Sequence, residues 1–304
     1  MSTTIPAMRR FRSSTAELMA LTWGDPGDPA ALLVHGFPDS AWTWDVIGPA
    51  LAATGRYVVA PFTRGYGPSS LATDDDYSIG SLVDDIIGIH RDIGADDRAI
   101  VIGHDWGGAI VSALTASHPG LFRRSVLIAI PPLATIKALF APSRLPHNFR
   151  RVARQAPHSW YMPVVSTPWL SDAIGGWLVA RLWEAWSPNP ATTRHRDLGL
   201  AALGNRTRRR AAFSYYRAVW NPLYRRTTDH RHEQLAAFDD PRVPTLYLQG
   251  AEDTCGLVYT GADALEHLPP GSLRTVVEAA GHFTHLDQPE IVTRHIIDFV
   301  GKGV

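Results

Sequence analysis

The hydrophobic residues of this chain gather in short continuous runs, most of which are bounded by Gly, Pro or charged residues. Continuous apolar runs are typical of strands that are buried on both faces of a mainly parallel sheet. Segments with helical spacing lie between the runs, such as residues 79–93 and 106–117. This alternation predicts a doubly wound α/β fold. The five predicted strands cover residues 31–35, 57–60, 99–102, 125–130 and 245–248.

The two ends of the chain extend this pattern. Residues 11–22 predict an antiparallel hairpin arm or edge strand that enters the sheet, with a turn at residues 25–29, where Pro and Gly alternate with Asp. Residues 273–278 predict the last strand, and residues 291–300 predict a closing amphipathic helix.

The strand pattern stops after Pro132. From Leu133 to about Asp240 no apolar run resembles a buried strand, while Pro, Arg and Trp accumulate. Helical spacing is found there at residues 177–186 and 208–220. We therefore predict a helical cap at residues 133–240, inserted into a core formed by residues 1–132 and 241–304.

Composition limits the classes of protein. The chain has 304 residues, of which 45% are hydrophobic and 19% charged, so a substantial core is expected. No apolar run reaches the ~18 residues of a membrane span, and the first residues lack the apolar stretch of a secretion signal. The single cysteine, Cys255, excludes an intramolecular disulfide and is interpreted as a small buried filler. These features predict a cytoplasmic location.

Charge is balanced overall but unevenly distributed. Residues 133–240 contain 16 Lys and Arg against 7 Asp and Glu, although the whole chain has 29 of each class. A solvated basic surface explains this excess better than nucleic-acid binding does. The only dense basic cluster lies at residues 206–210, and no nucleic-acid-binding motif surrounds it.

The candidate nucleophile is Asp105. It lies in the sequence Gly103-His-Asp-Trp-Gly107, between a predicted strand and a predicted helix. This is the Gly-x-nucleophile-x-Gly pattern of a strained strand-to-helix turn, in which most such chains carry Ser. A carboxylate at this position attacks as an alkylating nucleophile and forms an alkyl ester, so acyl transfer is disfavoured.

Hydrolysis of such an ester requires a base that activates water and an acid that orients the base. His282, in a Gly-His loop after the last predicted strand, is the candidate base, and His285 is its rival. Asp253, in a loop after the strand at 245–248, is the candidate acid, and its neighbour Glu252 is the alternative.

Backbone N–H groups are expected to stabilise the oxyanion of the intermediate. One belongs to Trp106 and the other to Phe37, in His35-Gly-Phe-Pro38. Pro38 makes that turn rigid, and a cis bond before it is one way to do so. His35 and His104 are expected to form hydrogen bonds within these loops and receive no catalytic role.

Four motifs in this order resemble the epoxide hydrolases of the α/β-hydrolase superfamily. They are His35-Gly-Phe-Pro38, Arg64-Gly-Tyr-Gly-Pro-Ser-Ser70, Gly103-His-Asp-Trp-Gly-Gly108 and Gly281-His282. The resemblance covers the core, about two-thirds of the chain. It implies an α/β-hydrolase fold, with a mostly parallel central sheet flanked by helices and an inserted helical cap.

The resemblance extends to two segments of the cap. Residues 159–163 and 214–217 resemble the segments that carry two ring-opening tyrosines, which implies that Tyr161 and Tyr216 donate hydrogen bonds to the epoxide oxygen. Tyr215 is the rival of Tyr216. The sequence after Tyr161 departs from the usual phenylalanine-rich pattern, so an indole N–H of Trp183 or Trp186 is an alternative donor.

The predicted substrate is a small-molecule epoxide, bulky and apolar, because the cap is rich in aromatic residues. Phe37, Trp106, Trp183 and Trp186 are the predicted substrate-binding residues. No cofactor, metal or nucleic acid is expected, and a homodimer is left open. Haloalkane dehalogenation is the alternative function, although Phe37 stands where a halide-binding Asn is expected. The remote alternative is a non-catalytic ligand-binding module.

Overall fold

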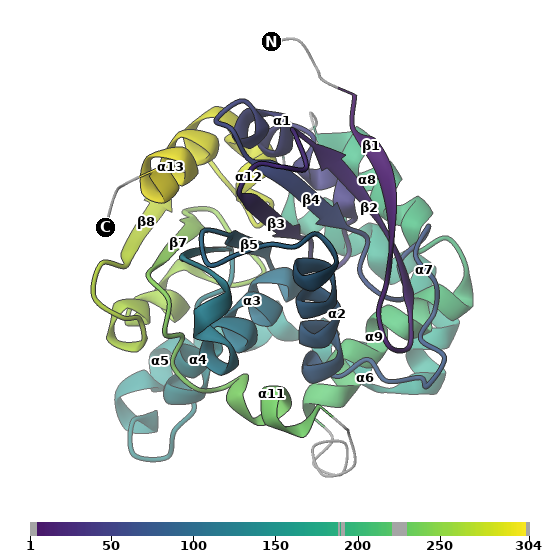
Figure 1. The fold of residues 1–304 in the computed structure, drawn as a ribbon. Helices are drawn as coiled ribbons and strands as arrows, with labels where there is room; N and C mark the ends of the chain where they lie inside the picture. The colour runs from purple at the N-terminus through teal and green to yellow at the C-terminus, as the bar shows by residue number, and fades with distance from the viewer. Residues whose placement is uncertain (1–4, 188, 190–191, 221–229, 302–304) are drawn as a thin grey trace.

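The computed structural model describes residues 5–187, 189, 192–220 and 230–301. These residues form an eight-stranded sheet in the order β1-β2-β4-β3-β5-β6-β7-β8 (Figure 1). β3 to β8 run parallel to one another, whereas β1 and β2 pair antiparallel. This arrangement confirms the α/β class. The strands are β1 (Ala7–Arg12), β2 (Glu17–Trp23), β3 (Ala30–Val34), β4 (Tyr57–Pro61), β5 (Ile100–His104), β6 (Arg124–Ile128), β7 (Thr245–Gly250) and β8 (Leu273–Val277).

All six predicted core strands coincide with β3 to β8, but the predicted turn of the first hairpin is wrong. The backbone N–H of Ser13 donates to the carbonyl of Ala16 at 2.9 Å, so the β1–β2 hairpin turns at residues 13–16. The turn at residues 25–29 exists and instead connects β2 to β3. Asp25 closes it by accepting hydrogen bonds from Gly27 and Asp28. Pro and Gly signal a turn without specifying which strands it joins.

Helices cover both faces of the sheet because its central strands are buried on both sides. In β3, Leu32 and Val34 belong to one hydrophobic cluster, whereas Ala31 and Leu33 belong to a second. The first cluster includes residues of α2 and α3, and the second includes residues of α1 and α13. These core helices are α1 (Ile47–Ala52), α2 (Ile79–Asp92), α3 (Trp106–Ser117), α12 (Thr284–Asp287) and α13 (Pro289–Gly301), with the short turns η1 (Ala41–Trp44), η2 (Pro119–Leu121), η5 (Val258–Gly261) and η6 (Ala264–His267).

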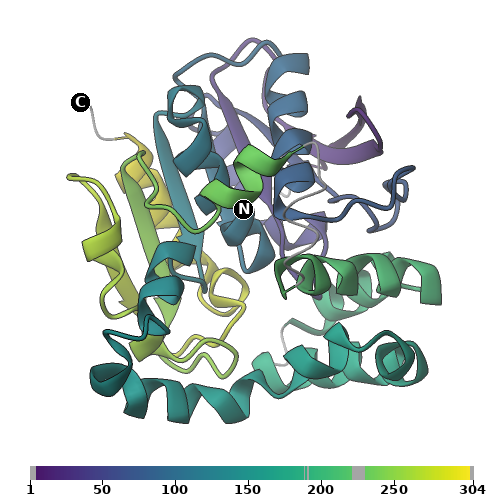
Figure 2. The same ribbon diagram turned by 90° about the horizontal axis from the view of Figure 1, so that it is seen from below.

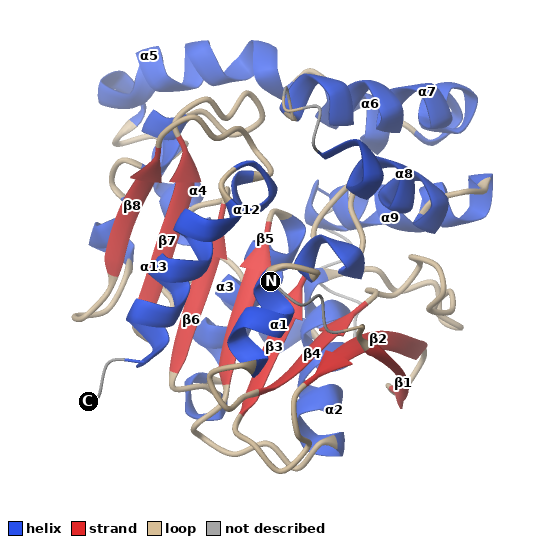
Figure 3. Cartoon of the chain, turned by 90° about the horizontal axis from the view of Figure 1, so that it is seen from above, coloured by secondary structure: helices blue, strands red, loops and turns tan. Residues whose placement is uncertain are grey.

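In the described part of the chain, only helices and turns lie between β6 and β7. Figure 2 shows most of this segment as a layer at one end of the sheet. Figure 3 shows α5, α6 and α7 in a row along this edge of the molecule. The elements are α4 (Leu133–Leu139), α5 (Leu145–Gln155), η3 (Ala156–Ser159), α6 (Tyr161–Ser166), α7 (Pro168–Trp186), α8 (Thr193–Ala202), α9 (Arg206–Trp220) and α11 (Arg231–Ala236).

The helices predicted at residues 177–186 and 208–220 lie within α7 and α9. The proposed cap boundaries of 133 and 240 stay a prediction, because α4 and α11 at the two ends of this range both contact α3 of the core. Among the helices that the structure describes, none combines the length and the apolar character that crossing a bilayer requires.

Candidate active site

Asp105 lies in the sharp turn between β5 and α3. Its backbone has φ of 51° and ψ of −118°, a strained conformation for a residue with a side chain. Close approach of the backbone explains the flanking glycines. A Cβ at Gly103 would collide with the carbonyl oxygen of Gly107, and one at Gly107 would collide with that of Val34. The turn therefore holds the carboxylate at the carboxyl end of the central strands.

His282 and Asp253 join Asp105 from the loops that follow β8 and β7. His282 Nδ1 lies 3.0 Å from Asp253 Oδ2, and His282 Nε2 faces Asp105 Oδ2 at 3.4 Å. All three residues are buried. The carboxyl ends of parallel strands meet at one edge of the sheet, which explains how residues far apart in sequence converge.

Additional hydrogen bonds fix the orientation of Asp253. Its Oδ1 accepts from the backbone N–H groups of Cys255 at 2.7 Å and Gly256 at 3.0 Å, and its Oδ2 also accepts from Gln249 Nε2 at 2.8 Å. The rival base, His285, instead has its Nε2 2.5 Å from Thr43 Oγ1. The structure therefore groups Asp253, and not His285, with the candidate base His282.

The pKa values suit a nucleophile beside a base. Burial opposes ionisation of Asp105, but the hydrogen bond and the charge of His282 outweigh it and hold the pKa of Asp105 below its usual value. Burial would lower the pKa of His282, but the carboxylates of Asp253 and Asp105 on its two sides raise that pKa well above its usual value. Both shifts favour an ion pair between His282 and Asp105.

The turn after β3 places a donor against the nucleophile. The backbone N–H of Phe37 donates to Asp105 Oδ1 at 2.8 Å, and the Phe37–Pro38 bond is cis. Trp106 is the first residue of α3, so its N–H has no acceptor within the helix. These are the two groups expected to form an oxyanion hole.

His35 forms a hydrogen bond within its own loop, as the sequence predicts, whereas His104 bonds to a different loop. His35 Nε2 accepts from the backbone N–H of Thr63 at 3.1 Å, and its Nδ1 lies 2.9 Å from the carbonyl oxygen of Gly36. His104 Nε2 donates to the carbonyl of His282 at 3.0 Å. This last bond links the turn of the nucleophile to the loop of the base.

Tyr161 and Tyr216 lie close together above the nucleophile. Their ring centroids are 5.9 Å apart, and the Tyr216 ring is 5.5 Å from that of Phe37. Burial, reinforced by the charge of Asp105, raises the pKa of both phenols well above the usual value, so both are hydrogen-bond donors at neutral pH. The hydroxyl of Tyr215, in contrast, donates to the carbonyl of Arg64 at 2.6 Å.

Comparison with known proteins identifies the family of this chain. A family model described as "alpha/beta hydrolase fold" matches residues 29–289. The chain belongs to this family.

Individual relatives of this α/β-hydrolase cover nearly its whole length. It is 27% identical to "Epoxide hydrolase A" of Mycobacterium tuberculosis, over 97% of each chain. A solved structure of epoxide hydrolase A from Mycobacterium thermoresistibile superposes with a TM-score of 0.75 at 25% identity, over 97% of this chain and 98% of the other. An epoxide hydrolase from Vigna radiata, with a TM-score of 0.78 over 99% and 100% of the two chains but 20% identity, supports the fold alone.

The two cap tryptophans of this α/β-hydrolase have different surroundings. The ring centroid of Trp186 lies 5.0 Å from that of His282 and 5.1 Å from that of Tyr161, so Trp186 borders the site. The indole N–H of Trp183 donates to the carbonyl of Pro38 at 2.7 Å, and its ring stacks on Phe283 at 3.7 Å. This bond contradicts the alternative in which Trp183 donates to the substrate oxygen, and nothing in these contacts supports Trp183 as a substrate-binding residue.

Cys255 is a site residue whose position sequence reasoning missed. Its sulfur lies 3.6 Å from the hydroxyl oxygen of Tyr161. Polar atoms of Asp105, Cys255 and His282 all lie within 4.8 Å of one another. Burial raises the pKa of Cys255, so it is a neutral thiol in the wall of the site. Its position in the sequence, two residues after the candidate acid Asp253, is the feature that could have indicated its place in the site.

A second buried group, Asp39, His104 and His285, lies behind the nucleophile. Polar atoms of the three side chains lie within 4.8 Å of one another, and Asp39 Oδ2, His104 Nδ1 and His285 Nδ1 have no hydrogen-bond partner. Burial raises the pKa of Asp39 to about 7 and lowers that of His104 to about 3, so the two imidazoles are neutral and Asp39 tends to keep its proton. This cluster was not predicted from the sequence either, although Asp39 directly follows the motif at residues 35–38.

Proposed function

We propose that this α/β-hydrolase is an epoxide hydrolase that converts an epoxide to a vicinal diol through an ester on Asp105. One observation carries the proposal: an ionised carboxylate occupies the nucleophile turn, with two protonated phenols beside it. A carboxylate displaces alkyl leaving groups, and phenols are suited to stabilise a basic alkoxide. The names of the relatives at 25–27% identity agree.

In the first step, an oxygen of Asp105 attacks an epoxide carbon and the carbon–oxygen bond of the ring breaks. The electron pair moves to the ring oxygen, which Tyr161 and Tyr216 stabilise by hydrogen bonds and which takes a proton from one of them. The products of this step are an alkyl ester on Asp105 and a phenolate. The Tyr161 hydroxyl lies against the sulfur of Cys255, which is a weaker acceptor than an alkoxide.

Esterification prepares the base for the second step. The hydrogen bond that His282 forms with the charged carboxylate of Asp105 contributes to the raised pKa of His282. The ester on Asp105 is uncharged, so this contribution is lost when the ester forms. The pKa of His282 therefore falls, and its proton passes to the phenolate. Neutral His282, oriented by Asp253, then takes a proton from water, whose oxygen attacks the ester carbonyl. The N–H groups of Phe37 and Trp106 stabilise the oxyanion. When the intermediate collapses, the leaving alkoxide takes the remaining proton of the attacking oxygen and departs as the diol, which restores the Asp105 carboxylate and leaves His282 protonated.

Haloalkane dehalogenation is the second candidate, because the Trp106 indole next to the nucleophile is a possible halide donor. Its ring centroid lies 4.9 Å from that of Tyr216, within the same site. Phe37 offers no second side-chain donor, and the two phenols suit an alkoxide better than a halide. A panel of apolar epoxides and haloalkanes, with diol and halide measured in parallel, separates the two functions. Halide release without diol formation would refute the proposal.

The origin of the diol oxygen tests the covalent step. In a single turnover with enzyme in excess, in water enriched in heavy oxygen, the first diol should carry no label, because its new oxygen comes from Asp105. Enzyme recovered after that turnover should carry the label in the Asp105 peptide. Label in the first diol would instead indicate direct attack by water.

Substitution of the base tests the second step. His282→Gln should still form the ester but hydrolyse it slowly, so the Asp105 peptide should gain the mass of the substrate. The neighbouring His285 serves as the control, because its Nε2 contacts Thr43 and not the triad. Unmodified His282→Gln protein after exposure to a substrate that the wild type converts would exclude this role.

The neighbouring residues Tyr215 and Tyr216 provide a matched pair of variants to test whether a phenol stabilises the epoxide oxygen. Tyr216→Phe should reduce the rate of ester formation, and combination with Tyr161→Phe should abolish it. Tyr215→Phe loses a buried hydrogen bond to Arg64 but no group at the site, so it should lower stability and leave the rate of ester formation largely unchanged. Equal losses of rate in Tyr215→Phe and Tyr216→Phe would contradict the assignment.

A further inference from the structure

The outer surface of the α5–α7 row is unusually apolar. Among the described residues, every exposed Phe or Trp lies between Phe140 and Trp177. Trp169, Phe149 and Trp177 are 74%, 65% and 60% exposed. We call this surface the cap face, and define it by Phe140, Leu145, Phe149, Trp160, Trp169 and Trp177 together with Arg150 and Arg154. Aromatic side chains gathered on one surface of this kind mark an interaction site.

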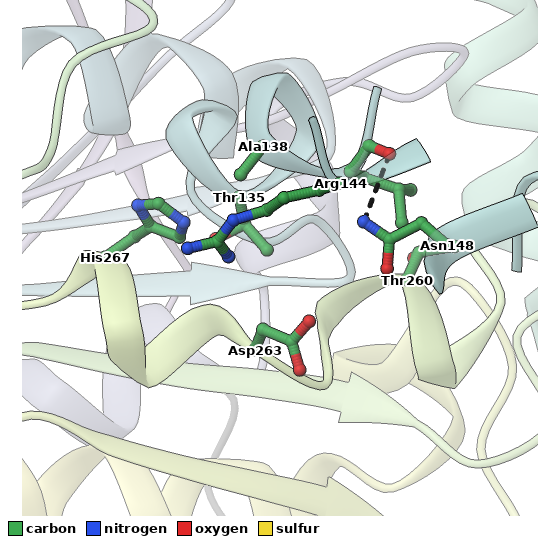
Figure 4. A pocket seen from close by; sticks show the side chains of 8 residues that line it. Thr135, Ala138, Arg144, Asn148, Thr260, Asp263 and His267 are labelled. Atoms are coloured by element: carbon green, nitrogen blue, oxygen red, sulfur yellow. Dashed lines mark hydrogen bonds between the residues drawn. The ribbon is translucent and has the colours of Figure 1, made fainter. Parts of the chain in front are cut away.

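α5 turns its polar side toward the protein. Figure 4 looks into the small pocket beneath it, which Arg144 and Asn148 line together with Asp263 and His267. Asn148, the only buried residue of α5, donates to the carbonyl of Leu139 at 3.2 Å, and Arg144 pairs with Glu266 at 3.1 Å. The polar groups of this helix are thus used for docking it onto the core.

The apolar side of α5 therefore faces outward. Leu145, Phe149 and Val152 follow one another at spacings of four and three residues, so they form one stripe, of which Leu145 and Phe149 are exposed. Arg150 and Arg154 are exposed on the same helix and take part in none of the ion pairs found among the described residues, and the Arg154 guanidinium lies 5.9 Å from the ring centroid of Tyr259. A helix that combines an exposed apolar stripe with arginines on its polar side is typical of helices that lie in a membrane interface.

α7 continues this surface. Its exposed residues include Trp169, Ala173, Gly176 and Trp177, which occupy one side of the helix, and its opposite side is buried. A helix that is apolar all round is normally covered on every side, but α7 is covered on one side only. Its only acidic residue before Glu184 is Asp172, which is paired with Arg206 and Arg210. Within the described part of the chain, the outer side of α7 is therefore exposed.

Charge identifies the partner. Among the arginines of residues 140–180, Arg144 and Arg151 pair with Glu266 and Asp263, so Arg150 and Arg154 are the two left outside the ion pairs of the described residues. The single acidic residue of this segment, Asp172, is itself paired with Arg206 and Arg210. A symmetric dimer through this surface would bring the arginines of two copies together, whereas an anionic surface complements them. Trp and Phe side chains insert at the level of lipid headgroups, and Arg binds their phosphates. We propose that the cap face binds peripherally to anionic phospholipid membranes. This inference is independent of the reaction at Asp105.

Co-sedimentation of the whole protein with vesicles tests the proposal. We expect binding to phosphatidylglycerol vesicles that high salt weakens, and little binding to pure phosphatidylcholine vesicles. Tryptophan fluorescence should shift to the blue as Trp160, Trp169 and Trp177 leave water. Brominated acyl chains should quench this fluorescence. Absence of binding to phosphatidylglycerol at low salt, or no change in fluorescence, would overturn the proposal.

Variants locate the binding surface. Arg150→Glu combined with Arg154→Glu should weaken binding at least about tenfold, because each arginine near an anionic surface contributes ~1 kcal/mol. Phe149→Ser combined with Trp169→Ser should reduce binding similarly by removing exposed apolar groups. The matched control is Arg231→Glu with Leu235→Ser, two exposed residues of α11, which contacts α2 and α3.

Circular dichroism and turnover of a soluble substrate verify that each variant is folded. Light scattering tests the alternative that the cap face binds a second copy of this chain instead of a membrane. If the wild type is a dimer that the cap-face variants dissociate, and vesicles bind all variants equally, the surface is a protein interface and the membrane proposal is wrong. If the α11 control loses vesicle binding to the same extent as the cap-face variants, the cap face is not the membrane-binding surface.

Discussion

Asp39 should make the stability of this protein depend on pH. The change to examine is Asp39→Asn, which keeps the shape of the side chain but removes its ionisation. Asp39 is completely buried and lies against His104 and His285, whose Nδ1 atoms have no hydrogen-bond partner. The amide that this substitution introduces can donate to one of these nitrogen atoms, as the protonated carboxyl can, so the variant should fold.

The magnitude follows from the pKa of Asp39. Burial, the largest cause, raises this pKa from 3.8 to about 7. A carboxyl whose pKa is raised on folding stabilises the folded state below pH 3.8, and this contribution is lost as pH rises through 7. A shift of about three units corresponds to ~4 kcal/mol, at about 1.36 kcal/mol per unit. Relative to Asp39→Asn, the wild type should therefore lose ~4 kcal/mol between about pH 4 and pH 7.

Urea unfolding at a series of pH values measures this difference. The free energy of unfolding of wild type minus that of Asp39→Asn should fall as pH rises, while the titration of groups outside the cluster cancels in the comparison. The cluster histidines stay neutral over most of this range, because their pKa values are lowered. A difference that is constant with pH, or one that grows, would refute the reasoning that Asp39 is held protonated by burial.

Two further predictions concern buried polar contacts outside the catalytic groups. Asp85→Asn should destabilise the protein by about 3–5 kcal/mol in urea unfolding, because it leaves the buried guanidinium of Arg64 without its bidentate partner. The exposed pair of Asp96 and Arg98 is the control, for which Asp96→Asn should leave the stability nearly unchanged; equal losses would contradict the argument from burial. Trp183→Phe should cost about 1–3 kcal/mol in the same assay, because the buried carbonyl of Pro38 loses its donor while the ring remains stacked on Phe283. An unchanged stability would show that this bond does not fasten the cap to the core.

Much of the fold could be predicted from local pattern. The predicted strands at 31–35 and 125–130 correspond to β3 and β6 within two residues, and the helix predicted at 106–117 is α3. Buried parallel strands produce continuous apolar runs that need no tertiary information to detect. The first hairpin was less predictable, since its turn at residues 13–16 contains neither Gly nor Pro.

The candidate triad was also accessible from sequence, because each member lies in a loop directly after a predicted strand. Asp105, Asp253 and His282 could be named by position alone, and the structure places them within hydrogen-bond or ion-pair distance of one another. The sequence pattern could not predict the role of a side chain when that role depends on contact with a distant segment. Trp183 and Trp186 look alike in sequence, but one bonds to Pro38 and the other borders His282.

The sequence by itself determined the strand–helix alternation, the carboxylate nucleophile and the order of the triad, since these depend on residue type and local spacing. Only the tertiary structure decided which polar groups meet in the interior and which apolar groups remain outside. Asp39, His104 and His285 come from three separate segments, and they form a cluster only because the ends of parallel strands converge. The exposed aromatic residues of α5 and α7 resemble core residues in sequence. They stay at the surface because the polar side of α5 is fastened to the core and because, in the part of the chain that the structure describes, one side of α7 is left exposed.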